Sequence, residues 1–313
     1  MSQILNQDAA AAVDFMKRTG SNVREDAGLW IAKQLEHVRT LGYEEPKIAN
    51  PLVNAIPRSS DIPEWAETFT YPVYDEVGIA KIIANYADDL PRVDIAATEV
   101  TAKIQPVGVS YGYNTQELTV SNAMGSNLPA RKAVVARKAT DRKIEDLTMV
   151  GEARYGVTGI VNHPNIGVTV LPTSTAWGAV ATTADAIMAD VDALMNALAL
   201  QSSGVHMATH FFMPLTAYTA MNSKRNTAKG DTALTMAREA YPSVTFVGVP
   251  QLKATKQVIV GEFTSTNIEA IVPQPFKQLP AQERNLEFVI PCTARAGGVS
   301  VYQPLAFTRA TLV

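Results

Sequence analysis

Two histidines have the spacing that a helical metal site requires. His206 and His210 are four residues apart, so on a helix both imidazoles would lie on one side and could bind a transition metal. The segment from His206 to Met213 is instead rich in apolar and aromatic residues, which favours the start of a strand. No HExxH motif accompanies the pair. We therefore expect a structural role for these histidines and no metal site.

The single cysteine and the adjacent acidic residues offer little further chemistry. Cys292 follows Pro291 in an apolar C-terminal segment with no neighbouring base or cation to activate it, so we expect a buried thiol. Asp88–Asp89 and Glu44–Glu45 are adjacent carboxylates, and adjacent side chains point apart on both helices and strands. Spacing alone therefore provides no acid–base pair.

A glycine-rich stretch, GEARYGVTG at residues 151–159, has the composition of a phosphate-binding loop. Such a loop follows a strand, opens a helix and ends in Gly-Lys-Ser/Thr, whereas this stretch follows a predicted helix and lacks that ending. Its glycines are better explained as a helix stop and a sharp change of chain direction. We expect no nucleotide site and no cofactor.

Basic residues concentrate between Arg131 and Lys143, where six cations accompany one acid, Asp141. A cluster of this kind suits packaged nucleic acid or an acidic neighbouring chain. The simpler interpretation is a solvated helix face with salt bridges or pairing between subunits, and we favour it. No set of residues with the spacing of a catalytic site is visible along the chain. The remaining candidates for function are residues that could form contacts at the protein surface.

Composition places the chain among globular proteins. It has 313 residues, 47% of them hydrophobic and 18% charged, with a net charge of −3. Enough apolar surface is present for a large core, and the charge gives no overall signature of a nucleic-acid binder. One cysteine excludes an intrachain disulfide. The N-terminus lacks the pattern of a signal peptide, and no apolar run is long enough for a membrane span, so we expect no membrane partner.

The N-terminal third predicts a helical arm followed by a hairpin. Residues 1–50 have helical periodicity, and the four prolines between Pro46 and Pro63 predict an extended segment. Alternating side chains predict strands at 69–73 and 107–113, with a long excursion between them. Two long strands of this kind would form a projecting hairpin, which cannot bury both of its faces without a partner.

The remaining two thirds predict a long helix, a mixed block and a return to strands. Residues 128–151 lack internal glycine and contain only an early proline, which predicts a helix about 35 Å long. A second helix is expected from a cap at Thr182 or Thr183 to Leu200. Strands at 208–213, 244–249 and 257–262 alternate with helical patterns, which indicates a sheet flanked by helices. Strands are expected again within 286–312.

This order of elements resembles the major capsid proteins of tailed phages, whose fold is named after phage Hong Kong 97. Four strings carry the resemblance: YDEVGIAKI at 74–82, YADDLP at 86–91, YGY with a following QE at 111–117, and GEARYGVTGIVNHP at 151–164. The resemblance implies an α+β fold with four parts. They are an N-terminal arm (1–63), an extended loop (64–115), a peripheral domain with a spine helix (116–153 and 281–313) and an axial domain (154–280).

The resemblance also implies a function and a set of partners. The chain would assemble with copies of itself, as hexamers and pentamers, into the closed icosahedral or prolate shell of a virion, formed in the host cytoplasm. It would not be an enzyme. A separate scaffolding protein, a portal, a possible decoration protein and non-specifically contacted DNA are the expected partners. The alternatives are an encapsulin-type nanocompartment shell and, from another class, a metal- or nucleotide-dependent enzyme.

The residues expected to form assembly contacts belong to the extended loop, the spine helix and the turn after it. They are Tyr71, Tyr74, Asp75, Glu76, Lys81, Asp88, Asp89, Arg131, Arg137, Arg142, Arg154, Tyr155, Gly156 and Asn162.

Overall fold

The computed structural model describes residues 50–59, 61–77, 94–123, 128–173, 175–228, 230–285 and 287–312. Internal contacts divide the chain into Met1–Ile48 and Ala49–Val313, and everything below concerns the second unit. The expected N-terminal helices lie outside the described residues. No helix among the described residues is long and apolar enough to cross a membrane.

A five-stranded sheet forms the centre of the C-terminal half, in the order β6-β15-β9-β7-β8. Its strands are β6 (Gly167–Val168), β7 (His210–Pro214), β8 (Thr245–Val249), β9 (Gln257–Gly261) and β15 (Phe307–Thr311). Successive side chains of a strand point to opposite faces, and both faces of this sheet are buried. In β7, Phe211 and Met213 join one core cluster, while Phe212 joins another.

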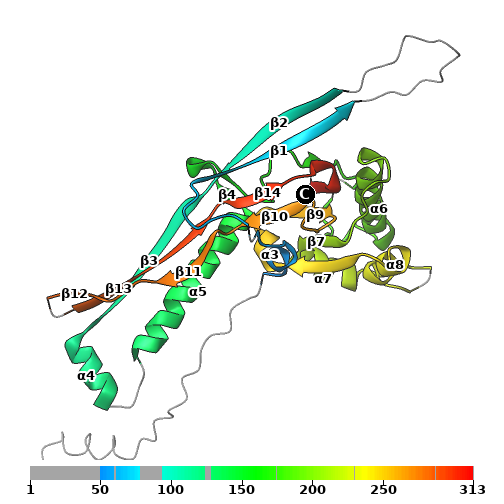
Figure 1. Cartoon of the computed structure of the whole chain (residues 1–313). Coiled ribbons are helices and arrows are strands. Elements are labelled where there is room, and N and C mark those ends of the chain that lie inside the picture. Colours follow the sequence, from blue (N-terminus) through cyan, green and yellow to red (C-terminus); the bar gives the residue numbers. More distant parts are fainter. Residues whose placement is uncertain are drawn as a thin grey trace, which may run out of the picture. The chain divides into compact units, whose positions relative to one another are not determined.

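Three helices cover the first face of this sheet, as the alternating pattern predicts (Figure 1). They are α6 (Ala184–Gln201), α7 (Leu215–Ser223) and α8 (Ala233–Ala240). The Thr183 hydroxyl accepts a hydrogen bond from the backbone N–H of Ala186, and Thr232 caps α8 in the same way, so both helices begin at threonines.

The second face is covered by a short helix and a two-stranded sheet. Helix α3 (Pro51–Ala55) buries Leu52 and Val53 beside strands β10 (Ile268–Ile271) and β14 (Gly298–Val301). Four prolines led us to predict an extended segment here, and that prediction is wrong for α3. Pro51 occupies the first helical position, where its missing N–H costs nothing, and burial of Leu52 stabilises the turn.

A second, longer sheet runs alongside the spine helix (Figure 1). Strand β3 (Gln105–Asn114) pairs with β13 (Glu287–Ala296) over ten antiparallel residue pairs. Strands β11 (Gln274–Gln278) and β12 (Gln282–Arg284) both pair with β13, and helix α4 (Thr115–Ala123) follows β3 directly.

Helix α5 (Leu128–Met149) is the predicted spine, with 22 residues and a length of about 33 Å. Ala136 packs with Ile290 and Cys292, while Ile144 and Leu147 pack with later residues of β13. The helix therefore lies along the strand. Val134 and Val150 are apolar, but both side chains are exposed. Val134 lies about 200° around the helix from Ala136, and Val150 lies beyond the last turn.

The chain turns sharply after the spine through β4 (Gly151–Glu152), a 3₁₀ turn (Ala153–Tyr155) and β5 (Val157–Thr158). Gly151 has φ 72°, and a Cβ there would lie 2.4 Å from the carbonyl oxygen of Val157. Only glycine fits this position, which confirms the predicted helix stop. Two further 3₁₀ turns, Pro250–Lys253 and Pro304–Ala306, lead into β9 and β15.

The hairpin forms between strands that differ from those we expected. Strand β1 (Thr68–Val77) pairs with β2 (Asp94–Lys103) in ten antiparallel pairs, from Thr68↔Lys103 to Val77↔Asp94. The predicted strand at 107–113 is real, but it belongs to β3 and pairs with β13. The sequence 94–103 has little apolar alternation because most of its described side chains are exposed, so periodicity could not reveal it.

Candidate functional site

An aromatic residue at the root of the hairpin, Tyr71, contacts the core. The Tyr71 hydroxyl donates a hydrogen bond to the backbone carbonyl of Val301 at 3.1 Å. Its ring packs edge-on against Tyr302 with a centroid distance of 4.8 Å. Burial raises the pKa of Tyr71, which therefore remains a neutral donor. Tyr71 was predicted as an assembly residue, but in the isolated subunit it is an anchor.

Beyond this anchor, the described hairpin side chains are largely uncovered. Tyr74 is 64% exposed, and Ile95 on the opposite strand is 59% exposed. Among the described residues, β1 and β2 pair with each other and with no other strand. A two-stranded ribbon with bare faces is marginally stable in water, so this region needs an external contact.

Five of the predicted hairpin residues can be placed only in part. Asp75 and Glu76 lie in β1, opposite Ala96 and Ile95. Lys81, Asp88 and Asp89 lie outside the described residues, in the segment that connects β1 to β2.

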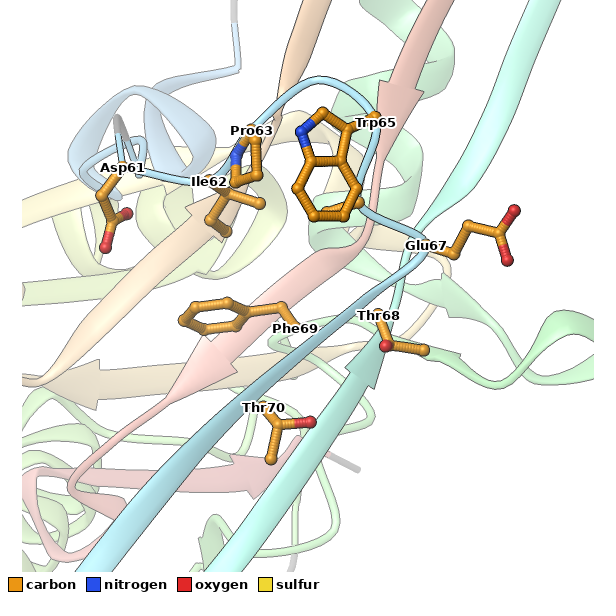
Figure 2. A pocket seen from close by; sticks show the side chains of 9 residues that line it. Asp61, Ile62, Pro63, Trp65, Glu67, Thr68, Phe69 and Thr70 are labelled. Atoms are coloured by element: carbon orange, nitrogen blue, oxygen red, sulfur yellow. The ribbon is translucent and has the colours of Figure 1, made fainter.

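A groove of about 630 Å³ lies at the root of the hairpin, and the sequence did not reveal it. Figure 2 shows Ile62, Trp65 and Phe69 around this space, with the carboxylates of Asp61 and Glu67 on opposite sides of it. Trp65 is 79% exposed, which is unusual for so large an apolar side chain. The groove combines an apolar floor with an acidic margin, a combination that suits an apolar segment bearing a cation.

The predicted basic cluster on the spine is partly used within the subunit. The Lys132 ammonium contacts a carboxylate oxygen of Glu117 at 2.9 Å and the carbonyl oxygen of Gly112 at 2.8 Å. Lys132 lowers the pKa of Glu117 through this hydrogen bond. Lys143 contacts Glu152 at 2.9 Å. These lysines bind carboxylate and carbonyl oxygens of their own subunit, so they are poor candidates for binding another chain.

The three predicted arginines of the spine, in contrast, remain at the surface. Arg131, Arg137 and Arg142 are all exposed. Arg137 forms a 3.8 Å ion pair with Asp141, and exposed pairs of this type contribute about 0–1 kcal/mol. The arginine side chains are therefore accessible to an external anion.

The turn after the spine separates an exposed tip from a structural brace. Arg154 and Tyr155 are exposed, and the guanidinium lies 5.7 Å from the ring centroid of its neighbour. Gly156 has φ 71° and ends the 3₁₀ turn. The Asn162 side-chain amide donates to the carbonyl oxygen of Val150 at 3.0 Å, which holds the two sides of the turn together.

The histidines and the cysteine occupy structural positions. A His206 ring nitrogen lies 2.8 Å from Glu262, whereas His210 stacks on Phe212 and burial lowers its pKa. The described residues contain no group of three or more potential metal ligands. Cys292 is buried, and this burial raises the pKa of its thiol, so little reactive thiolate forms at neutral pH.

The fold matches solved capsid structures over nearly the whole chain. A chain from the capsid of Myoviridae phage XM1 aligns with TM-score 0.76 and 16% identity, covering 90% of this chain and 98% of that one. Mycobacterium phage Ogopogo gives TM-score 0.61 and 12% identity, with 90% and 97% covered. A virus-like particle from Pyrococcus furiosus gives 0.55 and 14%, with 84% and 92% covered. The fold is therefore of the Hong Kong 97 capsid type.

A family model identifies the protein family to which the chain belongs. The model described as Major capsid protein matches residues 78–313, well over half of the chain. The chain belongs to the major capsid protein family and is a capsid shell subunit. No curated protein matches the chain. The predicted fold class and function are confirmed, and the nanocompartment and enzyme alternatives are not favoured.

Proposed function

We propose that this subunit closes shells by placing its β1–β2 hairpin on a neighbouring copy. The observation that carries the proposal is the contrast along the hairpin, where Tyr71 is tied to the core while Tyr74 and Ile95 are exposed to solvent. Water is a poor partner for these apolar side chains, and a second copy is the partner present at highest local concentration during assembly. The part of the hairpin that contacts the neighbouring subunit then includes Asp75, Glu76, Lys81, Asp88 and Asp89.

Each of the four parts of the chain has its own role in the proposal. The arm (1–63) and the extended loop (64–115) reach other subunits, except for α3 and β3, which pack within the subunit. The peripheral domain (116–153 and 281–313) and the axial domain (154–280) form the wall. The many modest contacts of hexamers and pentamers add up cooperatively, and the exposed tip at Arg154, Tyr155 and Gly156 contributes to them. Asn162 acts on these contacts indirectly, by bracing the turn.

The further partners in this proposal are other capsid components and the genome. Exposed Arg131, Arg137 and Arg142 support a non-specific contact with packaged DNA, whose phosphates attract any accessible guanidinium. A scaffolding protein, a portal and a decoration protein complete the set. Enzymatic activity has no part in the proposal, because His206, His210 and Cys292 serve ion pairing and packing within the subunit.

A shortened hairpin tests the proposal. Residues 75–96 are replaced by Asn-Gly, which joins Tyr74 to its partner Ala97 through a two-residue turn and keeps the Tyr71 anchor. We expect wild-type protein to form closed polyhedral particles in electron micrographs. The shortened variant should remain folded, with an unchanged urea midpoint, and form no closed particles. Normal particles from the shortened variant would contradict the role of the hairpin.

A further inference from the structure

The spine helix has an exposed stripe on the side that faces away from its own sheet. Helix α5 buries Ala136, Ile144 and Leu147 against β3 and β13 (Figure 1). On the opposite side, five exposed residues follow one another at spacings of three or four and therefore lie in one line along the helix. They are Arg131, Val135, Ala139, Arg142 and Asp146, and we call them the spine stripe.

The charges of the spine stripe oppose the dipole of the helix. A helix carries partial positive charge at its N-terminus and partial negative charge at its C-terminus, so acids favour the first turn and bases the last. Helix α5 has no acid in its first turn and no base in its last turn. Arg131 instead lies in the first turn and Asp146 in the last. The stability of the subunit therefore does not explain this arrangement, whereas a contact with another molecule does.

A second copy of α5 in the antiparallel direction offers the complementary charges at the required spacing. Arg131 and Asp146 are separated along the helix by about 22 Å. When two copies lie antiparallel with their centres near Ala139, Arg131 of each copy lies opposite Asp146 of the other. Two ion pairs then form, one at each end of the contact. Each arginine also lies at the C-terminus of the other helix, whose dipole attracts a cation.

The middle of the spine stripe suits close contact between two helices. Ala139 has the smallest side chain of the stripe, and packed helices lie about 8–10 Å apart. In the antiparallel arrangement, Val135 of each copy lies opposite Arg142 of the other, whose methylene groups can cover the valine. Val135 is 63% exposed in the subunit. The pairing therefore removes apolar surface from water in addition to matching the charges.

We propose that α5 pairs antiparallel with α5 of a second copy across a two-fold axis, with Arg131 of each copy bound to Asp146 of the other. The inference rests on the proposed shell function and adds to it a self-complementary contact between neighbouring hexamers or pentamers. A two-fold axis is the symmetry that this reciprocal pairing requires. The DNA contact then falls to Arg137, which lies about 120–140° around the helix from Arg131 and Arg142.

The small size of this contact determines where it forms. A stable interface between two proteins buries about 1,200 Å² or more, and one pair of helices of this length buries less. The contact therefore forms within the shell, where other interfaces hold the subunits together, and not between free subunits in solution.

Charge reversal tests the proposal. Arg131→Asp and Asp146→Arg, made separately, each place like charges opposite one another and should reduce the yield of closed particles about tenfold. The double variant Arg131→Asp/Asp146→Arg restores opposite charges and should assemble within about threefold of wild type. All three should have urea midpoints equal to or above that of the wild-type subunit, because the new charges complement the helix dipole.

The matched control is Asp141→Arg, which makes the same change of charge on another side of the helix. Asp141 is exposed and lies about 140° around the helix from Asp146. This variant should assemble within about twofold of wild type.

A proximity measurement gives an independent result. Ala139→Cys subunits treated with a short bis-maleimide should yield covalent dimers in assembled particles and none when unassembled, since native Cys292 is buried. Crosslinking should stop at dimers, because a two-fold axis pairs each cysteine once.

The outcomes separate the helix pairing from the shell function. Single reversals that assemble like wild type, a double variant as impaired as the single variants, or particles without the crosslinked dimer would overturn the pairing and leave the shell function intact. Arg131→Asp particles that form at normal yield but lose packaged DNA would assign this arginine to the genome and likewise overturn the pairing. Wild-type protein that forms no particles would instead refute the shell function.

Discussion

The five-stranded sheet and the β1–β2 hairpin are built from the same kind of ladder but have opposite environments. Both faces of the sheet are buried, and the Phe212 and Ile259 side chains are almost completely inaccessible. The hairpin has equally regular pairing, yet Tyr74 and Ile95 lie in solvent. Backbone pairing alone does not stabilise a ribbon, because water competes for the same hydrogen bonds. The comparison indicates that the sheet supplies subunit stability and the hairpin supplies assembly.

Changes in the two regions should therefore separate two measurements, the free energy of unfolding and the yield of particles. A change within the sheet should lower the first and reduce the second only as a consequence. A change on the hairpin should leave the first almost untouched.

The largest effect is expected from Phe212→Ala. This side chain packs edge-on against Phe263 at a centroid distance of 5.1 Å and belongs to the cluster that covers the second face of the sheet. Its removal leaves a cavity, and such changes cost about 3–5 kcal/mol. Urea unfolding of the unassembled subunit, followed by circular dichroism, would measure the loss. A change below about 1 kcal/mol would show that the sheet is not the stabilising centre.

Lowering the pH should reduce the free energy of unfolding by a smaller amount. Burial, assisted by the nearby Arg309 guanidinium, lowers the pKa of His163 from 6.5 to about 4. The folded state therefore resists protonation that the unfolded chain accepts. Above pH 6.5 this residue leaves stability unchanged, and as the pH falls from 6.5 to about 4 stability is lost, by up to ~3 kcal/mol.

The matched control for this prediction is His163→Gln, which lacks the titrating group. Urea midpoints measured between pH 7 and pH 4 should fall more steeply for the wild type than for this variant. Identical slopes for the two proteins would contradict the assignment. Described hairpin side chains include no histidine, so shortening the hairpin should leave the wild-type slope unchanged.

The features that sequence alone predicted are those fixed by local chemistry. The spine helix follows from an uninterrupted helical run, α6 from its threonine cap, and the turn after the spine from Gly151. The central strands follow from short apolar segments between turns. Each depends on residues close together in the chain, so a single sequence contains the necessary information.

The features that sequence missed depend on distant contacts. Nothing in the run 94–103 marks it as the partner of β1, because most of its described side chains are exposed in the subunit, where apolar residues are not required. Helix α3 forms because Leu52 finds a core cluster assembled from later parts of the chain. The root groove is lined by residues 61–70 alone, but an exposed Trp65 has no sequence signature that would reveal it.

The smallest effect on stability, together with a clear effect on assembly, is expected from Trp65→Ala. The side chain is largely exposed at the root groove, so its removal should change the free energy of unfolding by less than about 0.5 kcal/mol. If the groove receives an apolar segment of a neighbouring subunit, loss of the indole removes a large contact surface, and exposed aromatic anchors often contribute ~2 kcal/mol or more to an interface. Particle yield should then fall sharply.

Trp177→Ala provides the matched control, since this tryptophan is buried against α6, α7 and α8 and its indole N–H donates a hydrogen bond to Asp190. That variant should lose about 3–5 kcal/mol of stability. Parallel urea titrations and particle counts should show that Trp177 contributes to the stability of the subunit and that Trp65 contributes to assembly. Trp65→Ala subunits that unfold as early as Trp177→Ala subunits would mean that the hairpin root contributes to the core, and the separation between stability and assembly would then begin farther along the hairpin, beyond Tyr71.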